Sequence, residues 1–234
     1  MAKLGRLRNL LRYGHPRRFR AALGLLTSTS REPWLDTIGV DFNRATPEQV
    51  LPWITFPSID YLLERISPDM KVLEYGAGFS TIWWAGRVAK VTSLERHADW
   101  AGKVQAKLDS LGHTNVNLRV FGKLPEADSR IPWERFSRTE LDRLAEEYIR
   151  APEPEPEFYD VVVVDDIFRP ETLAAGAAFL KKGGLLILDD SEREVTRDAM
   201  KKLTREGWYM ANFWGPAPYH FHEKQTTIFT RPKA

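Results

Sequence analysis

Two glycines and two carboxylates have the types and spacing of a binding site for a small molecule. An apolar run ends at Glu74, passes through Gly76 and Gly78, and continues into a segment with helical apolar spacing. Because glycine lacks a Cβ atom, the backbone here can bend sharply and lie against a ligand, with the N–H groups of the helix start facing it. A second acid, Glu95, ends the next apolar run. Parallel sheets build small-molecule sites from such turns.

The Glu-x-Gly-x-Gly pattern, with the second acid ~20 residues later, resembles the first two motifs of class I S-adenosylmethionine (SAM) dependent methyltransferases, including bacterial ones with an EYG(S/A)G motif. A dinucleotide-binding turn would have a third glycine at the position of Thr81. The resemblance implies that Glu74 holds the amino group of SAM, directly or through water, and that Glu95 accepts both ribose hydroxyls. The cofactor-binding residues it implies are Glu74, Tyr75, Gly76, Ala77, Gly78, Ser80, Thr81, Glu95 and Asp165.

Two later apolar runs each end in a pair of carboxylates. The β-branched run 158–164 is typical of a strand buried on both faces and precedes Asp165 and Asp166, and the run 185–188 precedes Asp189 and Asp190. The ends of adjacent parallel strands meet at one edge, so Asp165, Asp189 and Asp190 would bring together the oxygen ligands that Mg²⁺ prefers. The alternative is that these acids cap helices or bind water near the cofactor.

These carboxylates resemble the metal-binding set of catechol and macrolide-sugar O-methyltransferases. The resemblance implies that Asp165, Asp189 and Asp190 bind Mg²⁺, and that one of them or Asp166 relays a proton from the acceptor. The chain departs from the catechol enzymes at Phe168, which stands in place of their basic lysine.

Two histidines supply candidate bases. His220 and His222 lie between the last two predicted strands, and because the sixth strand is expected to run parallel to the central strands, this segment would emerge at the ligand edge. Histidine titrates near neutrality. Each therefore either accepts a proton during the reaction or serves as polar surface.

Methyl transfer from a sulfonium chiefly needs positioning of the nucleophile, and an alcohol must also lose its proton. We therefore expect a SAM-dependent methyltransferase acting on a small-molecule or saccharide acceptor at oxygen. One alternative is an NAD(P)-dependent oxidoreductase with a Rossmann-type fold, which would share the glycine turn and the ribose acid. Another is a catalytically inactive SAM-fold protein that binds a membrane or a partner.

Strands and helices alternate along most of the chain, which predicts parallel strands joined by right-handed crossovers. The predicted strands are 72–75, 91–95, 116–120, 158–164, 185–188, 208–213 and 225–231, and the predicted helices are 58–66, 82–89, 100–111, 137–148, 170–180 and 196–203. With the resemblance, this gives a doubly wound α/β fold. Its mostly parallel seven-stranded sheet has the order 3-2-1-4-5-7-6 and an antiparallel last strand.

The remaining segments flank or interrupt this domain. Residues 1–45 form a basic N-terminal arm and loop, and residues 46–234 form the SAM-binding domain, interrupted by an insertion at 122–157 that either covers the substrate or is peripheral. Residues 51–57, with two large aromatic side chains, either pack on the domain or close over the ligand site.

The charge of the 234-residue chain is uneven. The net charge is +2, but residues 1–31 contain eight Lys and Arg and no acid, so the rest has an acidic excess and no face suited to nucleic acid. No apolar run is long enough to span a membrane, and the lack of cysteine excludes disulfides and thiolate chemistry. We expect a cytoplasmic protein. Residues 1–26 would be a solvated or partner-packed helix or, alternatively, make peripheral contact with the inner membrane face.

Overall fold

The computed structural model describes residues 31–121, 137–150 and 158–233. Most of the predicted arm and most of the predicted insertion lie outside these residues, so the membrane or partner contact of residues 1–26 stays a prediction. In the described part of the chain, no helix is both long enough and apolar enough to cross a membrane.

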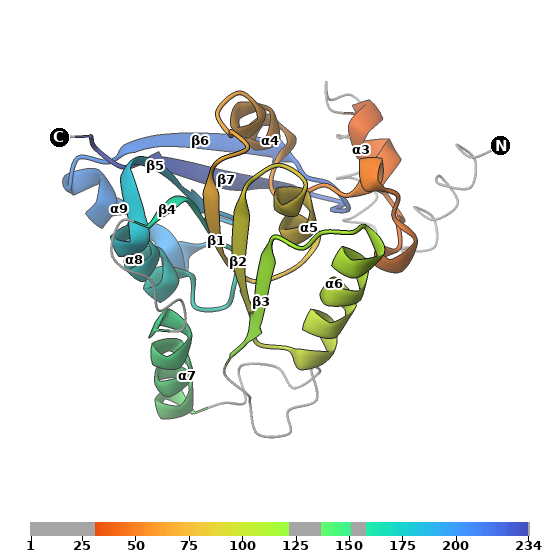
Figure 1. The fold of residues 1–234 in the computed structure, drawn as a ribbon. Coiled ribbons are helices and arrows are strands. Elements are labelled where there is room, and N and C mark those ends of the chain that lie inside the picture. Colours follow the sequence, from red (N-terminus) through yellow and green to blue (C-terminus); the bar gives the residue numbers. More distant parts are fainter. Residues whose placement is uncertain (1–30, 122–136, 151–157, 234) are drawn as a thin grey trace.

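One sheet with helices on both faces forms the body of the molecule (Figure 1). The strands are β1 (Lys71–Tyr75), β2 (Lys90–Glu95), β3 (Val116–Val120), β4 (Tyr159–Val164), β5 (Leu180–Leu188), β6 (Tyr209–Pro216) and β7 (Glu223–Thr230). The α-helices are α3 (Arg31–Thr37), α4 (Phe56–Leu63), α5 (Phe79–Ala85), α6 (Ala98–Ser110), α7 (Arg138–Arg150), α8 (Arg169–Phe179) and α9 (Arg197–Arg205). Short 3-10 helices lie at η1 (Phe42–Arg44), η2 (Pro47–Gln49) and η4 (Glu194–Thr196).

The predicted sheet order is confirmed. The seven strands are arranged as β3-β2-β1-β4-β5-β7-β6. β1 pairs in parallel with both β2 and β4, whereas β7 is antiparallel to both β5 and β6. Because the chain connections leave the centre of the sheet in opposite directions, a crevice opens beyond the carboxyl ends of β1 and β4, which is where open α/β sheets bind ligands.

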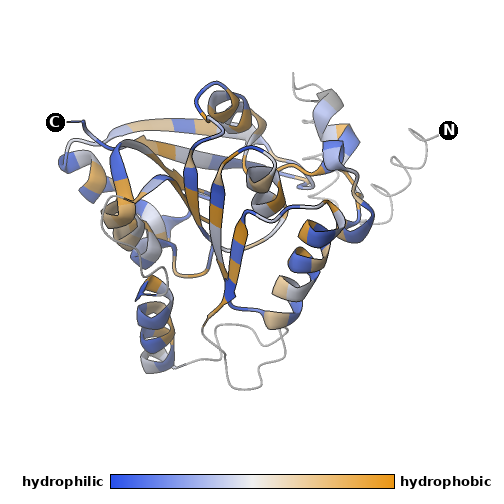
Figure 2. Cartoon of the chain, in the orientation of Figure 1, coloured by the Kyte–Doolittle hydropathy of each residue, from blue (hydrophilic) through white to orange (hydrophobic). Residues whose placement is uncertain are grey.

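Neighbouring residues of a strand point to opposite faces, and each face has its own apolar core. Val72 packs in the core under α4, α5 and α6, while Leu73 packs in the core under α7, α8 and α9. This double burial explains the nearly continuous apolar strands. In Figure 2, α6 and α7 show bands of hydrophilic residues beside hydrophobic ones, as expected for helices with one face on a core.

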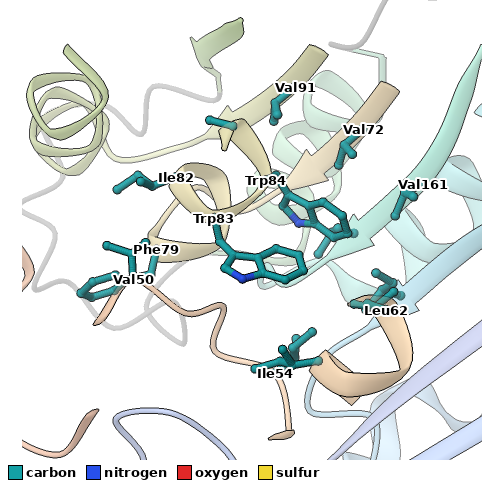
Figure 3. Close-up of a cluster of buried hydrophobic side chains, with 14 of the residues drawn as sticks. Val50, Ile54, Leu62, Val72, Phe79, Ile82, Trp83, Trp84, Val91 and Val161 are labelled. Carbon is teal, nitrogen blue, oxygen red and sulfur yellow. The ribbon is translucent and has the colours of Figure 1, made fainter. Parts of the chain in front are cut away.

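The N-terminal segment is part of the first core. Trp83 and Trp84 of α5 are each 1% exposed, and Figure 3 shows them among Ile54, Val72 and Val161. Trp34 and Ile38 are buried in the same cluster. Residues 31–45, which the sequence places with the arm, therefore pack against the core of the domain.

Several predicted boundaries differ from the observed ones, and two of them differ for clear local reasons. Helix α4 begins at Phe56 rather than after Ser58, because Pro57 fits a first helical turn, where its missing N–H is not needed. Strand β5 begins at Leu180 rather than at Leu185, so Gly183 and Gly184 lie within the strand. There is no room for a side chain at Gly184, since a Cβ atom would lie 2.8 Å from the Asp160 carbonyl oxygen of β4.

Gly76 should be required for folding, whereas Gly102 should not. A Cβ atom on Gly76 would lie 2.1 Å from the Asp165 carbonyl oxygen, and its φ of +97° disfavours any side chain. We expect Gly76→Ala to lower the free energy of unfolding by about 3 kcal/mol or more. Gly102→Ala, in α6 with nothing within 4 Å, should be neutral or stabilising. Urea unfolding would measure both, and equal effects would contradict the prediction.

Candidate functional site

A cavity of about 480 Å³ opens at the predicted edge of the sheet. Its walls include the glycine turn after β1, the ends of β2, β4 and β5, Tyr148 of α7, and residues at the start of β7. Glu95 at the end of β2 and Lys224 in β7 both line it, and their strands are four positions apart in the sheet. At ~4.8 Å per strand these two strands are about 19 Å apart, so the cavity is elongated across the edge of the sheet.

Glu95 is placed as predicted, at the cavity wall. Its carboxylate accepts hydrogen bonds from the backbone N–H groups of Ala77 (3.1 Å), Arg96 (2.8 Å) and His97 (2.8 Å). Burial raises its pKa, and these N–H groups oppose the rise. A carboxylate has about four lone-pair positions, so about one is left for a ligand. Geometry therefore favours one hydroxyl contact rather than the two that the resemblance implies.

Glu74 does not line the cavity. Of the two contacts that the sequence allowed, direct or through water, its position leaves only the one through water. It is fully buried, and its Oε2 atom accepts hydrogen bonds from the hydroxyls of Thr81 (2.5 Å) and Ser93 (2.6 Å). Thr81 Oγ1 in turn accepts a hydrogen bond from the N–H of Gly78 at 2.9 Å. Glu74 thus fixes the glycine turn from below. Burial raises its pKa to about 7, opposed by the hydroxyls of Ser80, Ser93 and Thr81. Within the described part of the chain, no group lies in hydrogen-bond geometry with its Oε1 atom.

The nine predicted cofactor-binding residues divide into two groups. Those that line the cavity are Gly76, Ala77, Gly78, Ser80, Glu95 and Asp165. Glu74, Tyr75 and Thr81 are fully buried and do not line it. The Tyr75 ring points to the other core, 5.4 Å from the ring of Tyr148. At Gly78, a Cβ atom would meet nothing within 4 Å, so this glycine borders open space.

Aromatic side chains complete the walls, and of these the sequence indicated only Trp53, within residues 51–57. Trp100 lines the cavity and donates a hydrogen bond from Nε1 to the Ala77 carbonyl at 2.7 Å. Tyr148 does the same from its hydroxyl to the Leu94 carbonyl at 2.8 Å. Trp53 is 40% exposed and borders the cavity, whereas Ile54 beside it is buried. Residues 51–57 therefore both pack on the domain and border the site.

The three predicted metal ligands lie near one another, but two cations occupy the space between them. Lys224 forms ion pairs with Asp189 and, at 2.8 Å, with Asp190. Arg169 forms ion pairs with Asp165 at 2.6 Å and with Asp190 at 3.2 Å. Among the described residues no group of three or more His, Cys, Asp or Glu has the arrangement of a metal site. The predicted Mg²⁺ set does not fit a metal here.

The charges in this cluster reinforce one another. Burial works against the ionised form of Asp190, but Lys224, Arg169 and Arg193 hold its pKa at about 2. Burial lowers the pKa of Lys224, but Asp189, Asp165 and Asp190 more than reverse this, so its pKa is raised. Burial is the main cause that raises the pKa of Asp189, and the negative charge of the nearby Asp165 raises it further.

Lys224 and Arg169 are the functional residues that sequence reasoning missed. A signal was present in the spacing, because Lys224 alternates with Thr226 and Ile228, which are buried in β7. A lysine on the inward side of a core strand needs a buried acid. Asp189, which directly follows the paired strand β5, provides it.

The remaining candidate acid and the two histidines differ in their placement. Asp166 lines the cavity but accepts hydrogen bonds from Thr172 Oγ1 (2.8 Å) and the Phe168 N–H, and burial raises its pKa to about 7. His220 also lines the cavity, and its Nε2 atom has no hydrogen-bond partner among the residues that the structure describes. Burial lowers the pKa of His220 to about 4, and the charges of Lys224 and His222 contribute to this lowering. His222 is exposed and does not line the cavity.

Solved structures of similar architecture identify the fold. A SAM-dependent O-methyltransferase from Thermotoga maritima aligns with a TM-score of 0.53 and 13% identity, over 81% of this chain and 72% of that chain. A candidate O-methyltransferase from Klebsiella pneumoniae aligns with a TM-score of 0.53 and 17% identity, over 94% of this chain and 91% of that chain. A candidate methyltransferase from Streptococcus mutans, in complex with S-adenosylhomocysteine (SAH), aligns with a TM-score of 0.51 and 15% identity. The alignment covers 74% of this chain and 96% of that chain. The chain has the class I methyltransferase fold.

No family model and no curated protein matches the sequence. The methyltransferase fold is therefore established by architecture: the sheet order, the reversed β7 and the cavity beyond β1 and β4. The acceptor and the roles of individual residues have to be argued from this chain's own side chains.

Replacing Glu74 should change how stability depends on pH. A pKa raised from 4.5 to about 7 on folding means that this group's contribution to stability is complete below 4.5 and is lost as pH rises through 7. Between pH 5 and 8.5, wild type should lose about 3 kcal/mol relative to Glu74→Gln, whose amide oxygen can still accept from Thr81 and Ser93. Urea unfolding at both pH values measures this.

The matched control is Glu64→Gln, because the side chain of Glu64 is 76% exposed. It should change stability equally at both pH values. A Glu74→Gln difference that is constant across pH would show that Glu74 is not held neutral by burial.

Proposed function

We propose that this protein is a SAM-dependent methyltransferase that transfers a methyl group to a small-molecule or saccharide acceptor at oxygen. The observation that carries the proposal is the cavity between the open space at Gly78 and the carboxylate of Glu95, beyond the ends of β1 and β2. The fold supports it, since the Thermotoga and Klebsiella structures of the same architecture are described as O-methyltransferases. The Streptococcus structure, described as a complex with SAH, supports the same cofactor class.

The residues at one end of the cavity fit SAM. Gly78 would border the ligand without a side chain, and Glu95 would accept a ribose hydroxyl. The unpartnered Oε1 atom of Glu74 would reach the amino group of the methionine part only through an intervening water, since Glu74 does not line the cavity. SAM, when bound, supplies an electrophilic methyl group.

The other end of the cavity fits an acceptor hydroxyl. His220 is neutral at pH 7 because of its lowered pKa, and its ring lies 5.3 Å from that of Trp53 in an edge-to-face contact. A neutral imidazole has a ring nitrogen that can accept the proton an alcohol loses during methylation, although the lowered pKa makes His220 a weaker base than an ordinary histidine. Trp53 gives the acceptor an aromatic surface, which suits a partly apolar or ring-shaped molecule.

The two other sequence hypotheses are less well supported. The sheet ends in a reversed hairpin, β6 and β7, which a nucleotide-dependent dehydrogenase sheet would not be expected to have. A catalytically inactive protein would have little use for a buried imidazole left unpartnered at the cavity wall. The cytoplasmic location and the membrane contact of residues 1–26 stay predictions.

SAH binding tests the proposal directly. At ~100 times its dissociation constant, SAH should add about 2.7 kcal/mol to the free energy of unfolding of the wild type. Gly78→Val should abolish this gain, because the new side chain would occupy the space where we place the ligand. Thermal unfolding with and without SAH is the measurement.

Two controls separate the hypotheses. Gly78→Val without SAH should unfold close to wild type, since nothing lies within 4 Å of its Cβ position and its φ of 179° suits any residue. Glu95→Ala should also lose the SAH response, but with lower intrinsic stability because it releases three backbone N–H groups. Stabilisation of wild type by NAD(P)H and not by SAH would support the oxidoreductase. A response to neither would support the inactive protein.

The two histidines form a matched pair for catalysis. His220→Gln should lower kcat by about 100-fold for any hydroxylated acceptor that the wild type methylates, because the proton acceptor is removed. His222→Gln should have a much smaller effect, because His222 is exposed and outside the cavity and reaches the reaction only through its ring contact with His220 at 5.3 Å. SAH release from SAM, measured with a panel of phenols and sugars, provides the assay. Equal losses in both variants would remove His220 from the mechanism.

A further inference from the structure

The acceptor end of the cavity contains a buried cation held by acids. Lys224 is 1% exposed although it lines the cavity, and the carboxylates of Asp189 and Asp190 hold its ammonium group. Thr226 Oγ1 donates a further hydrogen bond to Asp189 at 3.0 Å and so fixes the carboxylate. The position of the ammonium is therefore set from both β5 and β7.

The cluster leaves no net negative charge for a metal ion. Its acids are Asp165, Asp189 and Asp190, and the cations paired with them are Lys224, Arg169 and Arg193. Three negative and three positive charges cancel. A divalent cation placed among these acids would repel Lys224 and Arg169, both of which are buried and cannot move to solvent without leaving acids unpaired.

The ammonium has one more N–H group than recorded acceptors. It has three N–H groups, and among the described residues the carboxylates of Asp189 and Asp190 are the two acceptors recorded for it. The third is available to an oxygen atom of a molecule in the cavity that Lys224 borders. His220 borders the same cavity, and Lys224 is near enough to lower the pKa of its imidazole.

We propose that Lys224 is a catalytic residue that binds the acceptor oxygen, and that this built-in cation makes the reaction independent of a divalent metal. The proposal rests on the methyltransferase function proposed above. The acceptor O–H bond breaks and its proton passes to His220. The oxygen forms its bond to the methyl carbon while the carbon–sulfur bond of SAM breaks, and that electron pair stays on sulfur. The ammonium offsets the negative charge that develops on the oxygen.

Metal binding is the first test and needs no acceptor. Mn²⁺ at up to millimolar concentration should not bind to wild type, as followed by electron paramagnetic resonance, and should not shift its melting temperature. SAH binding should be the same in excess EDTA. Saturable Mn²⁺ binding that is lost in Asp189→Asn, or loss of activity in EDTA that Mg²⁺ restores, would overturn the proposal.

The second test separates catalysis from structure. Lys224→Met combined with Asp189→Asn removes the ammonium and one of its carboxylates together, so that no unpaired charge is left from this pair. The double variant should bind SAH with wild-type affinity but show kcat at least 100-fold lower, with KM changed much less. The matched control is Lys181→Met with Asp160→Asn, which removes an ion pair of 2.7 Å outside the cavity and should leave kcat unchanged.

The outcomes distinguish the two proposals. If wild type does not bind SAH, the proposed function fails, whatever the metal result. If wild type binds SAH and the double variant at Lys224 keeps its kcat, the function stands and the catalytic role of Lys224 is wrong. A double variant that does not fold leaves the Mn²⁺ and EDTA measurements on wild type to decide the metal-independence.

Discussion

The structure depends on the close approach of β1 and β4 at Gly76. The N–H of Asp165 donates to the Tyr75 carbonyl at 2.9 Å, and the N–H of Gly76 donates to the Leu94 carbonyl of β2, also at 2.9 Å. The end of β1 is thereby joined to both neighbouring strands just where the chain must turn away from the sheet. Only a residue without a side chain fits against the Asp165 carbonyl. The two glycines of the turn thus have different roles, Gly76 in closing the sheet and Gly78 in bordering the cavity.

Four carboxylates buried near this edge are stabilised in three ways. Hydroxyl groups surround Glu74, backbone N–H groups surround Glu95, and the ammonium of Lys224 holds Asp189 and Asp190. Burial raises the pKa of Glu74 to about 7, and burial also raises the pKa of Asp189 even though Lys224 is paired with it. The ion-paired Asp190 keeps a pKa near 2. Acids that look equivalent in the sequence therefore differ in charge at neutral pH.

Most of the fold was predictable because its signals are local. The apolar runs of β1, β2, β4 and β5 and the glycine turn are each contained in one short segment, and the resemblance supplied the strand order. Whether the Glu74 side chain faces the cavity or a covering helix depends on how the helices pack on the sheet, which no short segment shows. Glu74 shares with Val72 the strand face that α5 covers, so its carboxylate lies beneath the turn rather than at the cavity wall.

The sequence did not reveal the cations that make the three predicted metal ligands a poor fit for Mg²⁺, because the decisive partner is distant in sequence. Lys224 is 35 residues beyond Asp189, and the two meet only because β7 pairs with β5 in a particular register. The sequence placed three acids at one edge correctly but could not show which cations lay between them. Similarly, it gave His220 and His222 equal weight, and packing against Trp53 separates the buried one from the exposed one.

The segments outside the sheet are the parts of the chain best placed to determine the acceptor. Tyr148 of α7 is tied to β2 by its hydrogen bond to the Leu94 carbonyl, so this described part of the insertion is a fixed wall of the cavity. Trp53 and His220 form the opposite wall, and the Trp34 indole holds that wall by donating to the His220 carbonyl at 2.7 Å. Because residues 31–57 and the loop before β7 hold each other in place, the imidazole of His220 and the ring of Trp53 are positioned as one unit. The sheet supplies one end of the cavity, and these additions shape the other end.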